Sequence, residues 1–200
     1  MIVNKLKKGK LMHKKKLLIA ITVIVLLFIL IVPLKAPEKV LKIFYPIKYE
    51  NFVELCAKEY NVDKYLIYAI IKAESNFNEK AVSSKDAKGL MQLMDETAVD
   101  ISKKMKLNLS NEEISTKLLD ADFNIKLGSY YISILLQKYN SIELALVAYN
   151  AGSGKLDYWI EQGVLKADGT NIENVPYKET NNYVRKILRD YDIYKGLYKQ

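Results

Sequence analysis

Glu74 is the residue whose type and position best suit acid–base chemistry in this 200-residue sequence. It ends an apolar run, residues 66–73, whose pattern predicts a helix. The negative end of a helix dipole disfavours an ionised carboxylate, and apolar neighbours raise the pKa of the carboxyl further. A carboxyl group that is still protonated near neutral pH can protonate a glycosidic oxygen. Taken alone, a glutamate near a helix end is more often an ordinary surface residue.

Other catalytic groups are scarce in the sequence. The one histidine, His13, lies in a lysine-rich N-terminal segment, so the remaining residues offer no Ser–His or Cys–His pair and no Cys/His metal set. Cys56 is the one cysteine, so the chain cannot form an internal disulfide. The glycines of residues 152–154 lack the preceding strand of a phosphate-binding loop. Proton transfer would therefore depend on carboxylates, and we expect no metal and no other cofactor.

Helical patterns dominate the elements that must position Glu74. Asp63 and Asp95 are predicted N-cap residues, and Ser110 begins a capping-box pattern. No alternating run rich in Val and Thr predicts a sheet, so the domain is expected to be all-α, packed helix on helix. The apolar spacing and the capping signals predict helices over residues 49–60, 63–75, 95–105, 120–139, 141–151 and 179–191.

An uncharged apolar run, residues 17–34, follows a tail of 16 residues that holds seven lysines. Eighteen such residues are about the length of a membrane-crossing helix, and the lysines favour a cytoplasmic N-terminus. We therefore expect a basic cytoplasmic tail (1–16), a transmembrane signal anchor (17–34), a juxtamembrane linker (35–48) and an extracytoplasmic domain (49–200). The protein is thus expected to be a single-pass protein of the cell membrane.

Two other interpretations of the N-terminal segment compete with the anchor. A cleaved signal peptide has a shorter apolar core and a better cleavage site than residues 33–37 provide. A buried core helix usually has a polar face, which residues 17–34 lack. Removing the seven lysine charges of the tail from the net charge of +8 leaves +1 for residues 17–200. The domain therefore has no basic footprint for nucleic acid, and a nucleic-acid partner is not expected.

Three blocks of motifs lie between about residues 50 and 190. The first is E-S at 74–75, A-V-S at 81–83, G-L-M-Q at 89–92 and T-A at 97–98; the second is A-Y-N-A-G at 148–152; the third is E-T at 179–180 with Y-V at 183–184. In this order and spacing they resemble the signature of the Slt-type (family 1) lytic transglycosylases. A lone Glu-Ser pair would be worthless as evidence, but three blocks in the same order and spacing are specific. Loop 84–88, with the sequence SKDAK, is more charged than many versions of that loop.

The resemblance implies a goose-lysozyme-like all-α domain with a substrate groove, in which Glu74 is the single catalytic acid/base. It places Ser83 near an N-acetyl group of the substrate, Met94 and Tyr149 at the cleavage point, and Tyr183 in a hydrogen bond near Glu74. Glu179 could instead simply favour the N-terminus of its own helix. The implied substrate-binding residues are Ser75, Ser83, Gln92, Met94, Tyr149, Asn150, Glu179 and Tyr183.

The implied reaction is non-hydrolytic cleavage of the MurNAc-β-1,4-GlcNAc bond of peptidoglycan, which leaves 1,6-anhydro-MurNAc ends. The same fold could instead support a muramidase that hydrolyses this bond, or a non-catalytic wall-binding scaffold, although a scaffold would be expected to lose its acid. A short membrane tether would confine cutting to glycan near the bilayer. This suggests cell-wall remodelling, or the opening of the wall for a partner envelope machine.

Overall fold

A computed structural model describes residues 15–24 and 38–198, and the chain divides into two compact units, Met1–Phe44 and Tyr45–Gln200. In the first unit, residues 15–24 are helical, and α2 (Glu38–Phe44) buries none of its side chains. Within the residues described, no helix has both the length and the apolar character to cross a membrane. Of the expected anchor, 17–34, residues 25–34 lie outside the described residues, as do residues 1–14 of the expected tail.

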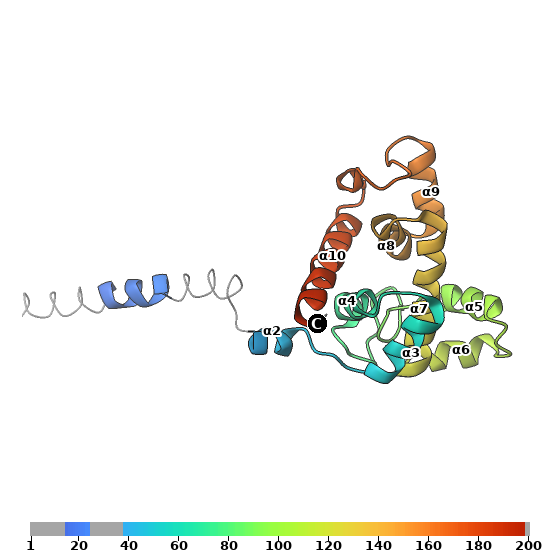
Figure 1. Ribbon diagram of the computed structural model, residues 1–200, viewed down its shortest axis with the longest axis horizontal. Coiled ribbons are helices and arrows are strands. Elements are labelled where there is room, and N and C mark those ends of the chain that lie inside the picture. Colours follow the sequence, from blue (N-terminus) through green and yellow to red (C-terminus); the bar gives the residue numbers. More distant parts are fainter. Residues whose placement is uncertain (1–14, 25–37, 199–200) are drawn as a thin grey trace, which may run out of the picture. The chain divides into compact units, whose positions relative to one another are not determined.

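The second unit is all-α, as predicted: from residue 45 to residue 198 its regular structure is helical apart from isolated bridges near residues 82–93. The helices of this unit are α3 (Glu50–Tyr60), α4 (Lys64–Ser75), α5 (Asp95–Lys104), α6 (Asn111–Lys117), α7 (Ala121–Tyr139), α8 (Ile142–Ala151), α9 (Ser153–Glu161), the 3-10 turn η1 (Ile172–Asn174) and α10 (Lys178–Tyr198). Helix α10 packs against α4 and α8, while α7 packs against α3 and α8 (Figure 1).

The capping predictions are confirmed at two helices and wrong at a third. The Asp63 carboxylate accepts the backbone N–H of Tyr65 at 2.8 Å, and Ser110 forms the expected capping box with Glu113. Asp95 is not an N-cap: it is the first residue of α5, and its carboxylate accepts hydrogen bonds from the Lys88 ammonium instead. The bonds to Lys88 join two ionised groups, and the sequence pattern did not indicate this partner, which is seven residues away.

Helix α10 is longer than predicted, and α9 was missed. Tyr194 and Leu197 continue the buried face of α10 beyond residue 191, where the sequence pattern no longer indicated a helix. The compact unit also begins earlier than the expected linker end at residue 48. The hydroxyl of Tyr194 donates to the Pro46 carbonyl at 3.2 Å, and Tyr45 donates to the buried carboxylate of Asp190 at 3.1 Å. Residues 45–48 therefore pack as part of the domain.

Two apolar clusters form the core of this unit. The larger cluster joins α3, α4, α7, α8 and α10, and the apolar face predicted for α4 lies fully inside it. The smaller cluster lies between α5, α6 and α7. Tyr131 and Tyr149 pack against both clusters. These two tyrosines therefore lie between the two clusters.

Candidate active site

Glu74 lies in the last turn of α4, at the negative end of the helix. The helix ends at Asn76, whose left-handed conformation (φ 49°) lets its N–H donate to the Lys72 carbonyl. Residues 65–71 of the same helix are buried, whereas Glu74 itself is partly exposed. Burial raises the pKa of Glu74 to about 7, against the opposing effects of a hydrogen bond from Tyr183 and the charge of Lys186. Near neutral pH this carboxyl group therefore exists in both protonation states.

Helix α10 supplies the polar neighbours of Glu74. The Tyr183 hydroxyl donates to Glu74 Oε1 at 2.6 Å, and one turn later the Lys186 ammonium donates to the Ala73 carbonyl at 3.0 Å. Burial and the charge of Glu74 raise the pKa of Tyr183 well above its usual range, so this hydroxyl stays a donor. Lys186 was missed from the sequence, although its spacing of three residues from Tyr183 places both on one face of a helix.

Helix α8 brings Tyr149 and Asn150 to the same region. The Tyr149 hydroxyl donates to the Met91 carbonyl at 2.9 Å, and its ring packs on Tyr131 with centroids 5.1 Å apart. Burial and the nearby charge of Glu74 raise the pKa of Tyr149 well above its usual range. The Asn150 side chain accepts a hydrogen bond from Thr180 of α10 at 2.8 Å. These hydrogen bonds therefore connect the end of α8 to α10 and to the loop that follows α4.

That loop, residues 81–93, carries Ser83 and Gln92. Gln92 has a left-handed backbone (φ 48°), and its side-chain amide donates to the carbonyls of Ala81 at 3.1 Å and Gly89 at 2.8 Å. The Ser83 hydroxyl accepts the backbone N–H groups of Lys85 and Ala87. Both side chains thus shape the loop. A non-glycine residue in the left-handed region costs about 1–3 kcal/mol, so this conformation persists because the loop's hydrogen bonds impose it.

The other three predicted residues make other contacts or are exposed. The Ser75 hydroxyl donates to the Ile71 carbonyl within α4, Met94 is 43% exposed as the N-cap of α5, and Glu179 is exposed in the first turn of α10. Among the described residues, the structure records no hydrogen bond between Glu74 and any of them. Their substrate-binding roles stay predictions, and so do those of the other five predicted residues, Ser83, Gln92, Tyr149, Asn150 and Tyr183.

The site contains one carboxyl group, Glu74, and one hydroxyl that donates a hydrogen bond to it, Tyr183. Three influences shift the pKa of Glu74: burial, the hydrogen bond from Tyr183 and the charge of Lys186. In the described part of the chain, no second carboxylate contributes to this shift. Over the same residues, no group of three or more His, Cys, Asp or Glu side chains is arranged to hold a metal ion. The arrangement suits a general acid that becomes a general base after it has given up its proton.

Comparison with known proteins points in the same direction. The family described as "Transglycosylase SLT domain" matches residues 52–171. The chain is 30% identical over 152 residues to the soluble lytic murein transglycosylase of Escherichia coli (strain K12), covering 75% of this chain and 23% of that protein. It is 38% identical over 117 residues to the membrane-bound lytic murein transglycosylase C of Photorhabdus laumondii, covering 54% of this chain and 32% of the relative.

A solved structure supports the fold. The lytic transglycosylase Slt from Pseudomonas aeruginosa, solved as an inactive mutant, superposes with a TM-score of 0.70 at 34% identity, covering 78% of this chain and 25% of that one. The chain therefore spans about a quarter of the length of that protein and of its E. coli relative. The family match, residues 52–171, contains α4, α7 and α8 but ends before α10. The all-α arrangement is the lysozyme-like fold of this family. By sequence and by fold, this chain belongs to the family of transglycosylase SLT domains.

Proposed function

We propose that this chain is a peptidoglycan lytic transglycosylase that cleaves the MurNAc-β-1,4-GlcNAc bond without consuming water. The observation that carries the proposal is the state of Glu74: a partly buried carboxyl group with a pKa of about 7, held by the Tyr183 hydroxyl at 2.6 Å. Membership of the SLT family supports the same substrate class. The substrate is expected to lie in a groove lined by loop 81–93, α8 and α10.

The proposed reaction uses Glu74 twice. First, protonated Glu74 gives its proton to the glycosidic oxygen, and the bond from that oxygen to the anomeric carbon of MurNAc breaks. The N-acetyl oxygen of the substrate can stabilise the anomeric carbon while it is electron-poor. The Glu74 carboxylate then takes the proton of the C6 hydroxyl, whose oxygen bonds to the anomeric carbon and closes a 1,6-anhydro ring. Glu74 gives up one proton in the first step and regains one in the second, so a single carboxyl group is sufficient.

The neighbours of Glu74 suit both halves of this cycle. Burial favours the neutral acid that the first step requires, while the Tyr183 hydrogen bond and the Lys186 charge favour the carboxylate that the second step requires. Because these influences oppose one another, the pKa settles near neutrality rather than at either extreme. A group with its pKa near the working pH is the most effective acid–base catalyst.

Mass spectrometry of purified peptidoglycan digested with residues 45–200 tests the proposal, with the Glu74→Gln variant beside the wild type. This segment coincides with a compact unit of the structure. Products lighter by one water than hydrolysis products, and absent from the variant digest, are expected. Reducing-end products would favour a muramidase instead. Binding to peptidoglycan without any product would favour the wall-binding scaffold.

We further propose that residues 17–34 anchor the domain in the cell membrane, with the basic tail in the cytoplasm. The uncharged run and the seven lysines before it support this arrangement. The full chain is expected to stay in the membrane fraction after alkaline carbonate extraction and to leave it when residues 17–34 are deleted. Release of the full chain by carbonate would contradict the anchor, without bearing on the reaction.

A further inference from the structure

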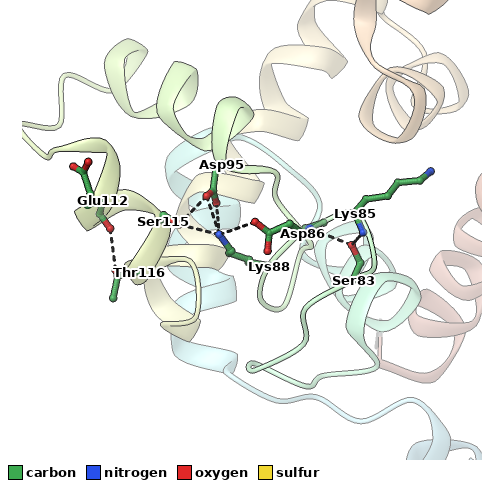
Figure 2. A network of polar contacts seen from close by, with 9 residues as sticks. Ser83, Lys85, Asp86, Lys88, Asp95, Glu112, Ser115 and Thr116 are labelled. Atoms are coloured by element: carbon green, nitrogen blue, oxygen red, sulfur yellow. Dashed lines mark hydrogen bonds and ion pairs between the residues drawn. The ribbon is translucent and has the colours of Figure 1, made fainter.

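The charged loop, residues 84–88, has a structural partner that its sequence does not indicate. The Lys88 ammonium donates to both carboxylate oxygens of Asp95, at 2.9 and 2.8 Å, and to the Ser115 hydroxyl at 2.8 Å. Asp86 lies 3.3 Å away on its other side. Figure 2 shows the ammonium facing these groups from α5, α6 and its own loop, while Lys85 extends away from them.

The Lys88 ammonium is largely shielded from solvent and has several hydrogen-bond acceptors. Its side chain is 13% exposed, and it has two carboxylates and a hydroxyl within reach. Ser115 in turn donates to Asp95 at 2.7 Å, which completes a closed network. Charge-assisted hydrogen bonds are short and directional. Lys88 is thereby tied to the first residue of α5 and to α6.

The backbone of Lys88 lies at the centre of the loop that carries Ser83 and Gln92. Lys88 is the middle residue of two antiparallel bridges, one to Val82 and one to Leu93. Its N–H and carbonyl pair with those of Leu93, both at 3.0 Å. A shift of Lys88 would therefore displace both Val82, which precedes Ser83, and Leu93, which follows Gln92.

The same loop is connected to the surroundings of Glu74. Asn124 of α7 is fully buried and donates to the Lys88 carbonyl at 2.9 Å, while it accepts the Met91 N–H at 2.7 Å. The Met91 carbonyl then accepts the hydroxyl of Tyr149. Lys88 is thus linked to the site from both its side chain and its backbone.

We propose that Lys88 is a positioning residue of the active site: its ammonium fixes loop 81–93 against α5 and α6, so that Ser83 and Gln92 meet the glycan in one geometry. This inference rests on the proposed function. It predicts an effect on substrate binding more than on the chemical step, because Glu74 and Tyr183 are held separately by α4 and α10. An interaction that is equal in the bound substrate and in the transition state changes KM and leaves kcat.

The test compares Lys88→Met with Lys88→Arg and with the control Lys85→Met, all in the wild-type domain. Methionine keeps the length of the side chain and removes the charge, and Asp95 keeps Ser115 as a partner at 2.7 Å. Lys85 is an exposed lysine of the same loop, so its variant controls for a lost surface charge. With soluble peptidoglycan fragments, Lys88→Met is expected to raise KM about tenfold and to change kcat less than about twofold. Lys88→Arg should restore most of the loss, and Lys85→Met should match the wild type.

Hydrogen exchange supplies a readout that does not depend on activity. The amides of Ser83, Gly89 and Leu93 donate within the loop and should lose protection in Lys88→Met, while the amides of α7 and α10 keep theirs. If the wild type makes no anhydro product, the proposed function fails, and this exchange experiment still decides whether Lys88 holds the loop. Unchanged KM or unchanged protection in Lys88→Met would overturn the inference.

The Asp95→Asn variant covers the case in which Lys88→Met does not fold. It removes the charge of the partner and keeps its size, so it should raise KM in the same direction. Where Lys88→Met folds, its combination with Asp95→Asn should be no worse than Lys88→Met alone, because both changes break one interaction. A KM of Asp95→Asn equal to that of the wild type would overturn the inference by itself.

Discussion

Replacing Tyr183 by phenylalanine tests whether the hydrogen bond at 2.6 Å sets the proton affinity of Glu74. This bond favours the ionised carboxylate, so its loss should raise the pKa above the present value of about 7. A hydrogen bond to a charged group contributes about 1.5–3 kcal/mol, and one pKa unit corresponds to about 1.4 kcal/mol. The lower end of that range predicts a rise of about one unit, to a pKa of about 8.

The pH dependence of kcat/KM reports this change, because the free enzyme must hold Glu74 protonated to act as the acid. Between pH 6 and pH 8, wild-type kcat/KM should fall about tenfold for a pKa near 7, whereas that of Tyr183→Phe should fall only about twofold. Absolute activity should also decrease, since the variant loses a contact that orients the carboxyl group.

The control is Tyr139→Phe, whose hydroxyl donates to Asp157 at 2.8 Å. It removes a tyrosine-to-carboxylate bond that does not involve Glu74, and its profile should keep the wild-type shape. An alkaline limb of Tyr183→Phe that stays at the wild-type position, or that moves to lower pH, would refute the assignment of Tyr183 as the donor that stabilises the carboxylate.

Three further predictions concern stability. The pKa of Glu74 is raised from 4.5 to about 7 in the folded chain, so the folded state holds the proton more tightly and loses stability as pH rises through this range. Urea unfolding should therefore find Glu74→Gln about 2–3 kcal/mol more stable than the wild type at pH 8 and nearly equal to it at pH 4; an equal difference at both pH values would contradict the burial of the carboxyl group. Asn124→Leu would strand the Met91 N–H and the Leu118 carbonyl, and would leave the Lys88 carbonyl with the Leu93 N–H alone. Its free energy of unfolding should therefore fall by at least about 2 kcal/mol, and a loss below about 1 kcal/mol would be inconsistent with these bonds. Gly89→Ala should lower the melting temperature sharply, because φ is +77° and the new Cβ would lie 2.2 Å from the Leu118 carbonyl oxygen, whereas Gly196→Ala in α10 meets no atom within 4 Å and should be neutral or stabilising.

Much of the fold was predictable because its signals are local. The apolar spacing of α4 reports which face of that helix is buried, and Asp63 and Ser110 supply caps from within the next few residues. The boundaries that failed depend on distant contacts. The end of α10 is set by packing that continues through Tyr194, and the start of the domain is set by Tyr45 on Asp190. Neither contact can be predicted from the spacing of apolar residues along the chain.

The candidate site divides along the same line. Motif order and spacing indicate the family and single out Glu74 as the candidate acid. The Asp95 prediction shows the limit: a residue with the sequence signature of a cap became instead a partner of Lys88. Asp95 could have accepted either a backbone N–H of its own helix or the Lys88 ammonium. The fold decided between them, because it places the Lys88 ammonium against the carboxylate.

By itself, the sequence determined that this domain is helical, which family it belongs to, and which carboxyl group is the candidate catalyst. Tertiary structure decided how that carboxyl group behaves. Its donor Tyr183 lies 109 residues away along the chain, and the Lys186 charge acts on it from the same distant helix. A pKa depends on desolvation and on charges within a few ångströms, and these are properties of the packed helices rather than of any segment of the chain.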